Sequence, residues 1–234
     1  MKKSLFLSLV LIAAMILMNQ SAVMAASTTV KIGFEGQAPV MDKVKMDADP
    51  KCKMMHPGGS VSDEVVVNAN GTLKNVFVYV KEGFGGKKFD TPKEVAVLDQ
   101  VGCAYNPKIL GVMSGQPIEI RNSDDTLHNV HALPTNSPQF NLGMPIKGMK
   151  LKKSFAKPEV MVKVKCEVHP WMRCYIGVVD NPYFGSTGDE GTVVLKDLPA
   201  GEYTIEAWHE KYGIQSKKVT VADADQTVDL TFKA

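Results

Sequence analysis

The chain has 234 residues, 44% of them hydrophobic and 22% charged, which is enough to bury one or two globular cores. Its formal net charge is only +2 and it has no extended basic run, so composition gives no support to nucleic-acid binding. Four cysteines are too few for a disulfide scaffold.

Residues 1–25 have the pattern of a secretory signal peptide. Lys2 and Lys3 precede an apolar run at 5–18, and the residues VMA at 23–25 form a small-residue cleavage pattern. The apolar run is shorter than the ~20 residues of a membrane-spanning helix, and no other stretch approaches that length. We therefore expect a periplasmic or secreted protein whose mature chain has no integral membrane span and whose cysteines can oxidise.

An N-terminal β region is expected over residues 28–100. TTVKIGF at 28–34 has strand character, and residues 64–80 read as a hairpin with a turn at 68–71. Residues 94–98 predict another short strand. No helix is signalled here or elsewhere, so the predicted fold class is all-β.

A loop within this region, DADPKCKMMHPGG, carries Cys52 and His56. This pair is either half of a metal site or, more simply, Cys52 forms a disulfide with Cys103. The methionines of the loop are expected to pack against other side chains rather than to store metal.

The most informative stretch is VMVKVKCEVHPWMRCYIGVV, residues 160–179. Its first part alternates as a strand and places Cys166 on one face with Val160, Val162 and Val164. Downstream of that cysteine, an imidazole and a thioether follow at C-x2-H-x2-M spacing, and residues 175–179 read as the returning strand.

A thiolate, an imidazole and a thioether on one short loop are ligands that copper prefers, here Cys166, His169 and Met172. A trigonal copper site needs one more histidine. The upstream motif LHNVH offers it at His128.

These two motifs resemble those of the cupredoxins, the small blue copper proteins, and the spacing of the second is most similar to the amicyanin type. The resemblance covers residues 105–180 and implies a cupredoxin domain, a Greek-key β-sandwich, over 101–183. It also implies a type 1 copper held by His128, Cys166 and His169, with Met172 as the weak axial ligand.

The resemblance further implies how this site would exchange electrons. His169 would be the ligand at the solvent edge, with Pro170 and Trp171 in an apolar docking patch for a redox partner protein. Glu167 departs from related loops, which often carry a small hydroxyl residue there. The usual hydrogen bond of the Asn129 side chain to this loop is therefore an open point.

A zinc site is the alternative for the same stretch. Cys174 would join Cys166, His169 and His128 in a Cys2His2 set, although Met172 has no role in it. His131 lies three residues after His128 and should therefore point to the opposite face of an extended strand.

Residues 184–234 resemble the second half of the carboxypeptidase regulatory-like, or transthyretin-like, β-sandwich through the run LPAGEYTI. The segment is too short for a full sandwich of roughly 100 residues. Either residues 28–98 supply the missing strands, which makes the copper domain an insertion, or the tail docks on the copper domain. We expect Trp208 to be structural and His209 to lie at the surface.

Enzyme signatures are missing from the sequence. The His-x-His motifs of multicopper oxidases do not occur, and five histidines are too few for the second copper of a nitrite reductase. Nucleophile elbows, phosphate loops and HExxH are also missing. We therefore expect a one-electron carrier and not an enzyme. The alternatives are a copper-binding or copper-delivery protein without a redox circuit, and a zinc-stabilised structural module.

Overall fold

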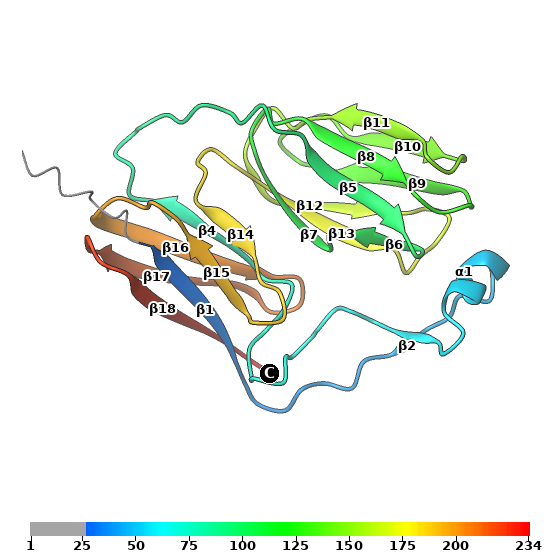
Figure 1. Cartoon of the computed structure of the whole chain (residues 1–234), viewed down its shortest axis with the longest axis horizontal. Helices are drawn as coiled ribbons and strands as arrows, with labels where there is room; N and C mark the ends of the chain where they lie inside the picture. Colours follow the sequence, from blue (N-terminus) through cyan, green and yellow to red (C-terminus); the bar gives the residue numbers. More distant parts are fainter. Residues whose placement is uncertain (1–26) are drawn as a thin grey trace, which may run out of the picture.

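Two β-sandwiches lie side by side in this computed structural model, which describes residues 27–234 (Figure 1). The expected signal peptide, residues 1–25, lies outside the described residues. The all-β class is confirmed, although the expectation of no helix was wrong for α1 (Pro50–Met55). From residue 27 onward, no helix has the length and apolar character needed to cross a membrane.

The central sandwich is built from the middle of the chain and has a five-stranded and a four-stranded sheet. The first has the order β10-β9-β12-β13-β7 and the second β11-β8-β5-β6. The strands are β5 (Ala96–Val101), β6 (Ala104–Asn106), β7 (Ile109–Met113), β8 (Ile118–Asn122), β9 (His128–Leu133), β10 (Phe140–Met144), β11 (Lys150–Lys153), β12 (Glu159–Lys165) and β13 (Arg173–Val179). Ile118 and Ile120 point into its core, as the alternation predicted.

The terminal sandwich is built from both ends of the described chain, with sheet orders β15-β1-β18 and β14-β4-β16-β17. Its strands are β1 (Thr28–Glu35), β4 (Phe77–Glu82), β14 (Phe184–Ser186), β15 (Thr192–Leu195), β16 (Gly201–His209), β17 (Gly213–Val221) and β18 (Gln226–Lys233). β1 runs parallel to β18, and β4 pairs with β14 and β16. The N-terminal strands thus complete the sheets of the tail, whereas β5 pairs with β8 of the central sandwich.

The expected hairpin over 64–80 forms only in part. Val67 and Leu73 make an isolated bridge around the predicted turn. The second half instead becomes β4, whose first four residues are all buried. Its two faces are covered by different layers, since Val78 and Val80 lie in the core of the terminal sandwich and Phe77 and Tyr79 pack with residues of the central one. Along its edges, β14 and β16 pair with it in place of the local partner.

A third group of buried residues joins the two sandwiches. Phe77 and Tyr79 from β4 pack with Ile109 from β7 and Val179 from β13. Val160 also packs against this group rather than with Val162 and Val164. The reason is a register shift in β12 between 159 and 162, which breaks the expected alternation.

Residues 37–63, here called the arm, leave β1, reach the far end of the central sandwich and return to β4 (Figure 1). The arm contains α1 and a small ladder of β2 (Lys43–Val44) with β3 (Ser60–Val61). Asp49 caps α1 by accepting hydrogen bonds from the amides of Lys51 and Cys52, and Pro50 follows at the first helical position. The Asp-Pro pair was therefore a helix-start signal.

Candidate metal centre

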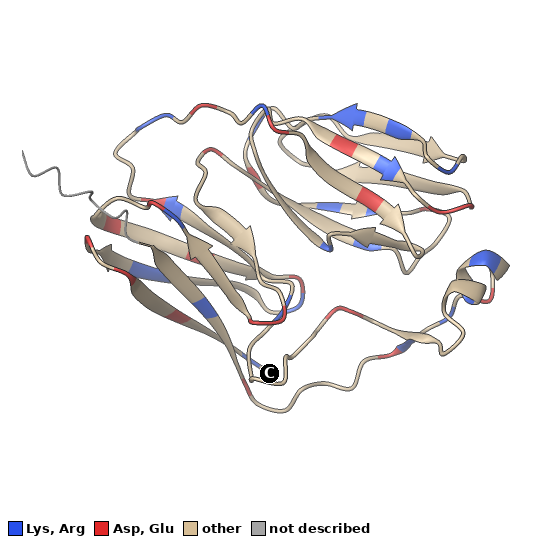
Figure 2. Cartoon of the chain, viewed as in Figure 1, with Lys and Arg blue, Asp and Glu red and all other residues tan. Residues whose placement is uncertain are grey.

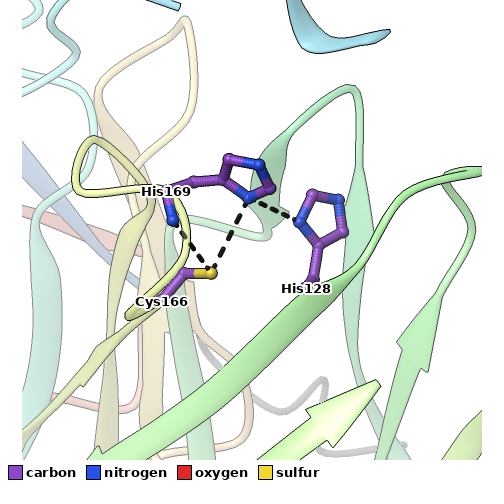
Figure 3. Close-up of side chains that lie close together, drawn as sticks. All are labelled: His128, Cys166 and His169. Atoms are coloured by element: carbon purple, nitrogen blue, oxygen red, sulfur yellow. Dashed lines mark hydrogen bonds between the residues drawn. The ribbon is translucent and has the colours of Figure 1, made fainter. Parts of the chain in front are cut away.

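Three predicted ligands meet at one end of the central sandwich (Figure 3). The Nδ1 atoms of His128 and His169 are 3.0 Å apart. The Sγ atom of Cys166 is 3.8 Å from Nδ1 of His169. All three side chains are buried, and their ligand atoms lie within 4.8 Å of one another.

Strand pairing brings the two ligand segments together. His128 begins β9, and Cys166 directly follows β12, which pairs antiparallel with β9. The amide of Cys166 donates to the carbonyl of Met172, and the amide of Met172 donates to the carbonyl of His169. These bonds close the loop 166–172. Met172 itself is buried in the core that contains Cys166.

The Cys166 sulfur accepts two backbone hydrogen bonds. The amide of Asn129 lies 3.5 Å from Sγ, and the amide of His169 lies 3.4 Å from it. Donors aimed at a sulfur ligand hold it in place and disperse the negative charge that a metal-bound sulfur carries. The fold therefore prepares this sulfur to act as a ligand.

Asn129 resolves the open point about Glu167. The amide nitrogen of Glu167 donates to Oδ1 of Asn129, and the Asn129 side-chain amide donates to Asn141. Because the loop contributes its backbone, the missing hydroxyl is not needed. The Glu167 carboxylate instead contacts His131, which lies away from the three ligands as predicted.

Each ligand histidine has a carboxylate on its other ring nitrogen. Oδ2 of Asp124 is 2.8 Å from Nε2 of His128, and Oδ2 of Asp49 is 2.9 Å from Nε2 of His169. Such pairs fix the orientation of a ring and direct its Nδ1 inward. Neither carboxylate was predicted from the sequence. Asp124 is four residues before His128 in the sequence. Asp49 is 120 residues from His169, and no local pattern links the two.

Burial and hydrogen bonding act in opposite directions on these groups. Burial alone would raise the pKa of Asp49, but the hydrogen bonds that it accepts outweigh this and lower the pKa to about 2. Burial lowers the pKa of His128 despite the adjacent Asp124. The ring of His128 is thus kept neutral, as a metal ligand must be.

His169 is not at the solvent edge, so the predicted exposed electron port is wrong. The residue is only 1% exposed, because the arm places Asp49 over its ring. Trp171 is likewise half-buried. Its ring packs 5.0 Å from the His169 ring, and its Nε1 donates to the carbonyl of Cys103. Of the expected patch, only Pro170 is exposed.

The disulfide between Cys52 and Cys103 is confirmed. It ties α1 to the turn between β5 and β6 and places Sγ of Cys52 3.7 Å from Nε2 of His169. Cys52 is therefore not available to a metal site with His56. That histidine instead contacts the carbonyl of Gly102 through Nε2, at 2.8 Å.

Cys174 and His209 both lie outside the group of predicted ligands. Cys174 is not in any converging group of metal-ligand side chains within residues 27–234, and burial raises the pKa of its thiol. A thiol kept protonated is a poor zinc ligand, which removes the support for the Cys2His2 set. His209 was expected at the surface, but it is completely buried in the terminal sandwich.

Charged side chains are spread over both sandwiches and the arm. Figure 2 shows basic and acidic residues interspersed over both sandwiches, although the charged residues of strand β11 are all lysines. This distribution agrees with the small formal net charge of the sequence.

Comparison with known proteins returns structural neighbours only. No family model and no curated protein matches the chain. The neighbours include a copper-containing nitrite reductase from Thermus scotoductus SA-01, at 23% identity and TM-score 0.35. They also include a purple cupredoxin from Nitrosopumilus maritimus, at 21% and 0.31, and an amicyanin mutant in its Cu(I) form, at 20% and 0.33.

These matches are partial. They cover 44%, 36% and 42% of this chain, respectively. The aligned part spans 25% of the nitrite reductase, 98% of the purple cupredoxin and 96% of the amicyanin mutant. The protein is thus an all-β chain of two sandwiches with cupredoxins among its structural neighbours.

Proposed function

We propose that this protein is an exported blue copper protein, periplasmic or secreted, that carries single electrons through a mononuclear type 1 copper site. His128, Cys166 and His169 would hold the copper, with Met172 as a weaker fourth ligand. One observation carries the proposal: two inward-facing imidazole Nδ1 atoms and one cysteine sulfur that accepts two backbone hydrogen bonds meet in a buried group. That donor set is the one that copper prefers in electron-transfer sites.

The residues around the pocket fit a resident copper. Asp49 and Asp124 occupy the Nε2 atoms of the histidines, which leaves both Nδ1 atoms to face Cys166. When bound, copper supplies one-electron chemistry by alternating between Cu(I) and Cu(II). The chain holds its ligands in place through the closed loop 166–172 and excludes water, so that little rearrangement accompanies a change of oxidation state.

A redox partner would have to approach a surface other than His169. Leu127 and Val168 adjoin two of the ligands in sequence and are each 44% exposed. Pro170 is exposed in the same loop. We place the docking surface on these three side chains, because exposed apolar residues beside buried ligands suit a short-lived contact.

The two sandwiches also define the proposed domain division. The copper domain, expected over residues 101–183, would be the central sandwich β5–β13, which also takes in β5 (Ala96–Val101) from the region expected over 28–100. The flanking strands form one second domain, for which the resemblance to the carboxypeptidase regulatory-like sandwich remains a prediction. Nothing in the described donor set assigns a metal to this second domain.

The direct test is the visible absorption spectrum of the purified protein after addition of Cu(II). The wild type should develop an intense blue charge-transfer band, and Cys166→Ser should lose it. The matched control is Cys174→Ser, which removes a buried thiol outside the ligand group and should keep the band. A colourless wild type that retains zinc would overturn the proposal.

A second measurement separates a carrier from a copper-delivery protein. Repeated reduction and reoxidation of the blue protein should leave its copper content unchanged, because the same buried ligands serve both oxidation states. Loss of copper on reduction would favour delivery instead.

A further inference from the structure

We infer that the arm, residues 37–63, is a disulfide-anchored cap over the metal centre and that Asp49 is the positioning residue through which it holds His169. The inference rests on the proposed function for the identity of the metal, but not for the existence of the cap. It assigns a role to a segment that the ligand motifs do not include.

One carboxylate links the arm to the ligand. Oδ1 of Asp49 accepts hydrogen bonds from the amides of Lys51 and Cys52, at 2.8 and 3.1 Å, and so caps α1. Oδ2 contacts Nε2 of His169 at 2.9 Å and accepts a hydrogen bond from Thr126 at 2.9 Å. Both oxygens are therefore engaged, and the position of His169 depends on the position of the arm.

The arm is anchored by one covalent bond and a few weaker contacts. The Cys52–Cys103 disulfide immediately follows the Asp49 cap and joins the arm to the central sandwich. Lys51 pairs with Asp125 at 2.8 Å, but both side chains are at least half exposed, so this pair contributes little. The disulfide is thus the covalent contact that helps to keep Asp49 within reach of His169, beside the hydrogen bonds of Thr126 to Asp49 and of His56 to the Gly102 carbonyl.

The cap has a consequence for metal exchange. In this fold His169 is buried, and its Nε2 side meets Asp49 and the Cys52 sulfur at hydrogen-bonding or van der Waals distance. For a competing ligand to take the metal, His169 must turn away or solvent must reach it. The arm opposes both movements, so metal release should be slow while the arm is anchored.

The carboxylate should also tune the centre. A negative charge on the outer nitrogen of an imidazole makes the inner nitrogen a stronger donor. A stronger donor favours the higher oxidation state of the metal. Removing the charge of Asp49 should therefore move the midpoint potential to a more positive value.

The experiment compares copper-loaded full-length wild type with Asp49→Asn and with Cys52→Ser/Cys103→Ser. Transfer of copper to an excess of a chelator is followed, together with the midpoint potential. We expect release about ten-fold faster or more in both variants, since a hydrogen bond to a charged group or a covalent anchor has been lost. Asp49→Asn should also raise the midpoint potential.

Asp47→Asn is the matched control. Asp47 lies on the same arm two residues earlier, is exposed and pairs with Lys53 at 2.7 Å. It should leave the release rate and the potential unchanged. Wild-type release in both Asp49→Asn and the double serine variant would overturn the cap, and so would equal effects of Asp47→Asn and Asp49→Asn.

A readout without metal separates this inference from the proposed function. In the metal-free protein, hydrogen exchange of the loop amides of Cys166, His169 and Met172 should accelerate in Asp49→Asn and in the double serine variant. Near-ultraviolet circular dichroism identifies any variant that has lost its fold. If the wild type takes up no copper but the loop still loosens, the proposed function fails and the cap stands. Unchanged exchange overturns the cap.

Discussion

At the scale of single residues, Asn129 joins three parts of the metal end. Its backbone amide donates to the Cys166 sulfur, its side-chain oxygen accepts from the Glu167 amide, and its side-chain nitrogen donates to Asn141. A side-chain amide can do this because it offers an acceptor and donors in one plane. One residue next to a ligand therefore couples the ligand loop to β9 and β10.

His209 is a titratable side chain in the interior of the terminal sandwich, where a charge would be unfavourable. It is fully buried, accepts a hydrogen bond from the Lys211 amide at Nδ1 and stacks on Tyr212. Within the described residues its Nε2 has no partner. Burial lowers the pKa of His209 to about 4, with Lys108 and Lys211 adding to this and Glu210 opposing it.

This low pKa predicts how stability depends on pH. The unfolded chain binds a proton near the ordinary value of 6.5, whereas the folded chain binds it only near 4. Between these values the unfolded state holds more protons, so stability falls as pH falls, by up to about 3 kcal/mol. Urea unfolding at pH 7 and pH 4.5 measures the loss, and His209→Gln should flatten it. An unaltered slope in that variant would exclude His209 as its source.

At the scale of elements, two glycines let β7 and β13 lie close to the terminal sandwich. A Cβ built on Gly177 would be 2.4 Å from the Phe77 ring, and one on Gly111 would be 2.4 Å from the Phe184 ring. Neither glycine has a positive φ. Their role is therefore to leave room for aromatic rings and not to permit an unusual backbone.

Gly177→Ala should accordingly destabilise the protein by about 1–3 kcal/mol, because the added methyl displaces a fully buried ring. Chemical denaturation measures the change. Gly143→Ala is the matched control, since it lies in strand β10 with nothing within 4 Å of the new Cβ. Equal stability of the two variants would contradict close packing at Gly177.

The short helix α1 has a start signal in the sequence, but the composition of the segment as a whole predicts a loop. The segment 50–55 has too few residues to show a helical period, and neighbouring glycines and prolines favour a loop. Its start signal, Asp49-Pro50, is present. What keeps so short a helix in place is the disulfide at Cys52 and the contact of Asp49 with His169.

At the scale of the whole molecule, charged groups from three segments meet between the sandwiches. Glu210 of the terminal sandwich lies 2.9 Å from Lys108 and 2.9 Å from Arg173 of the central one. The arm contributes Asp63, 2.7 Å from Lys108. The side chains of Lys108 and Glu210 are 7% and 4% exposed. Breaking such a buried pair leaves an uncompensated charge.

Glu210→Ala should therefore cost about 3 kcal/mol and weaken the association of the two sandwiches. Calorimetry should show a lower Tm, with a broadened or split transition. The exposed Glu190→Ala provides the comparison and should unfold like the wild type. A Glu210→Ala protein that also unfolds like the wild type would mean that the apolar cluster around Phe77 alone joins the sandwiches.

Features that depend on residues close together in the sequence were predictable, whereas contacts between distant segments were not. The strand before Cys166, the inward direction of Ile118 and Ile120, and the spacing of the ligand loop are local patterns, and the structure shows them. The partners of β4 were predicted wrongly because a buried strand has no local mark that names its neighbours. Asp49 was missed for the same reason, since it approaches His169 from 120 residues away.

The sequence by itself determined the all-β class, the position of the ligand motifs and which side chains are chemically suited to hold a metal, because alternation and donor type are properties of short segments. Only the tertiary structure decided that β1 and β4 complete the sheets of the tail and that His169 is buried. It also decided which carboxylates stand behind the histidines. Those contacts form only when segments that are distant in the sequence come together, and no short stretch of sequence specifies which segments will meet.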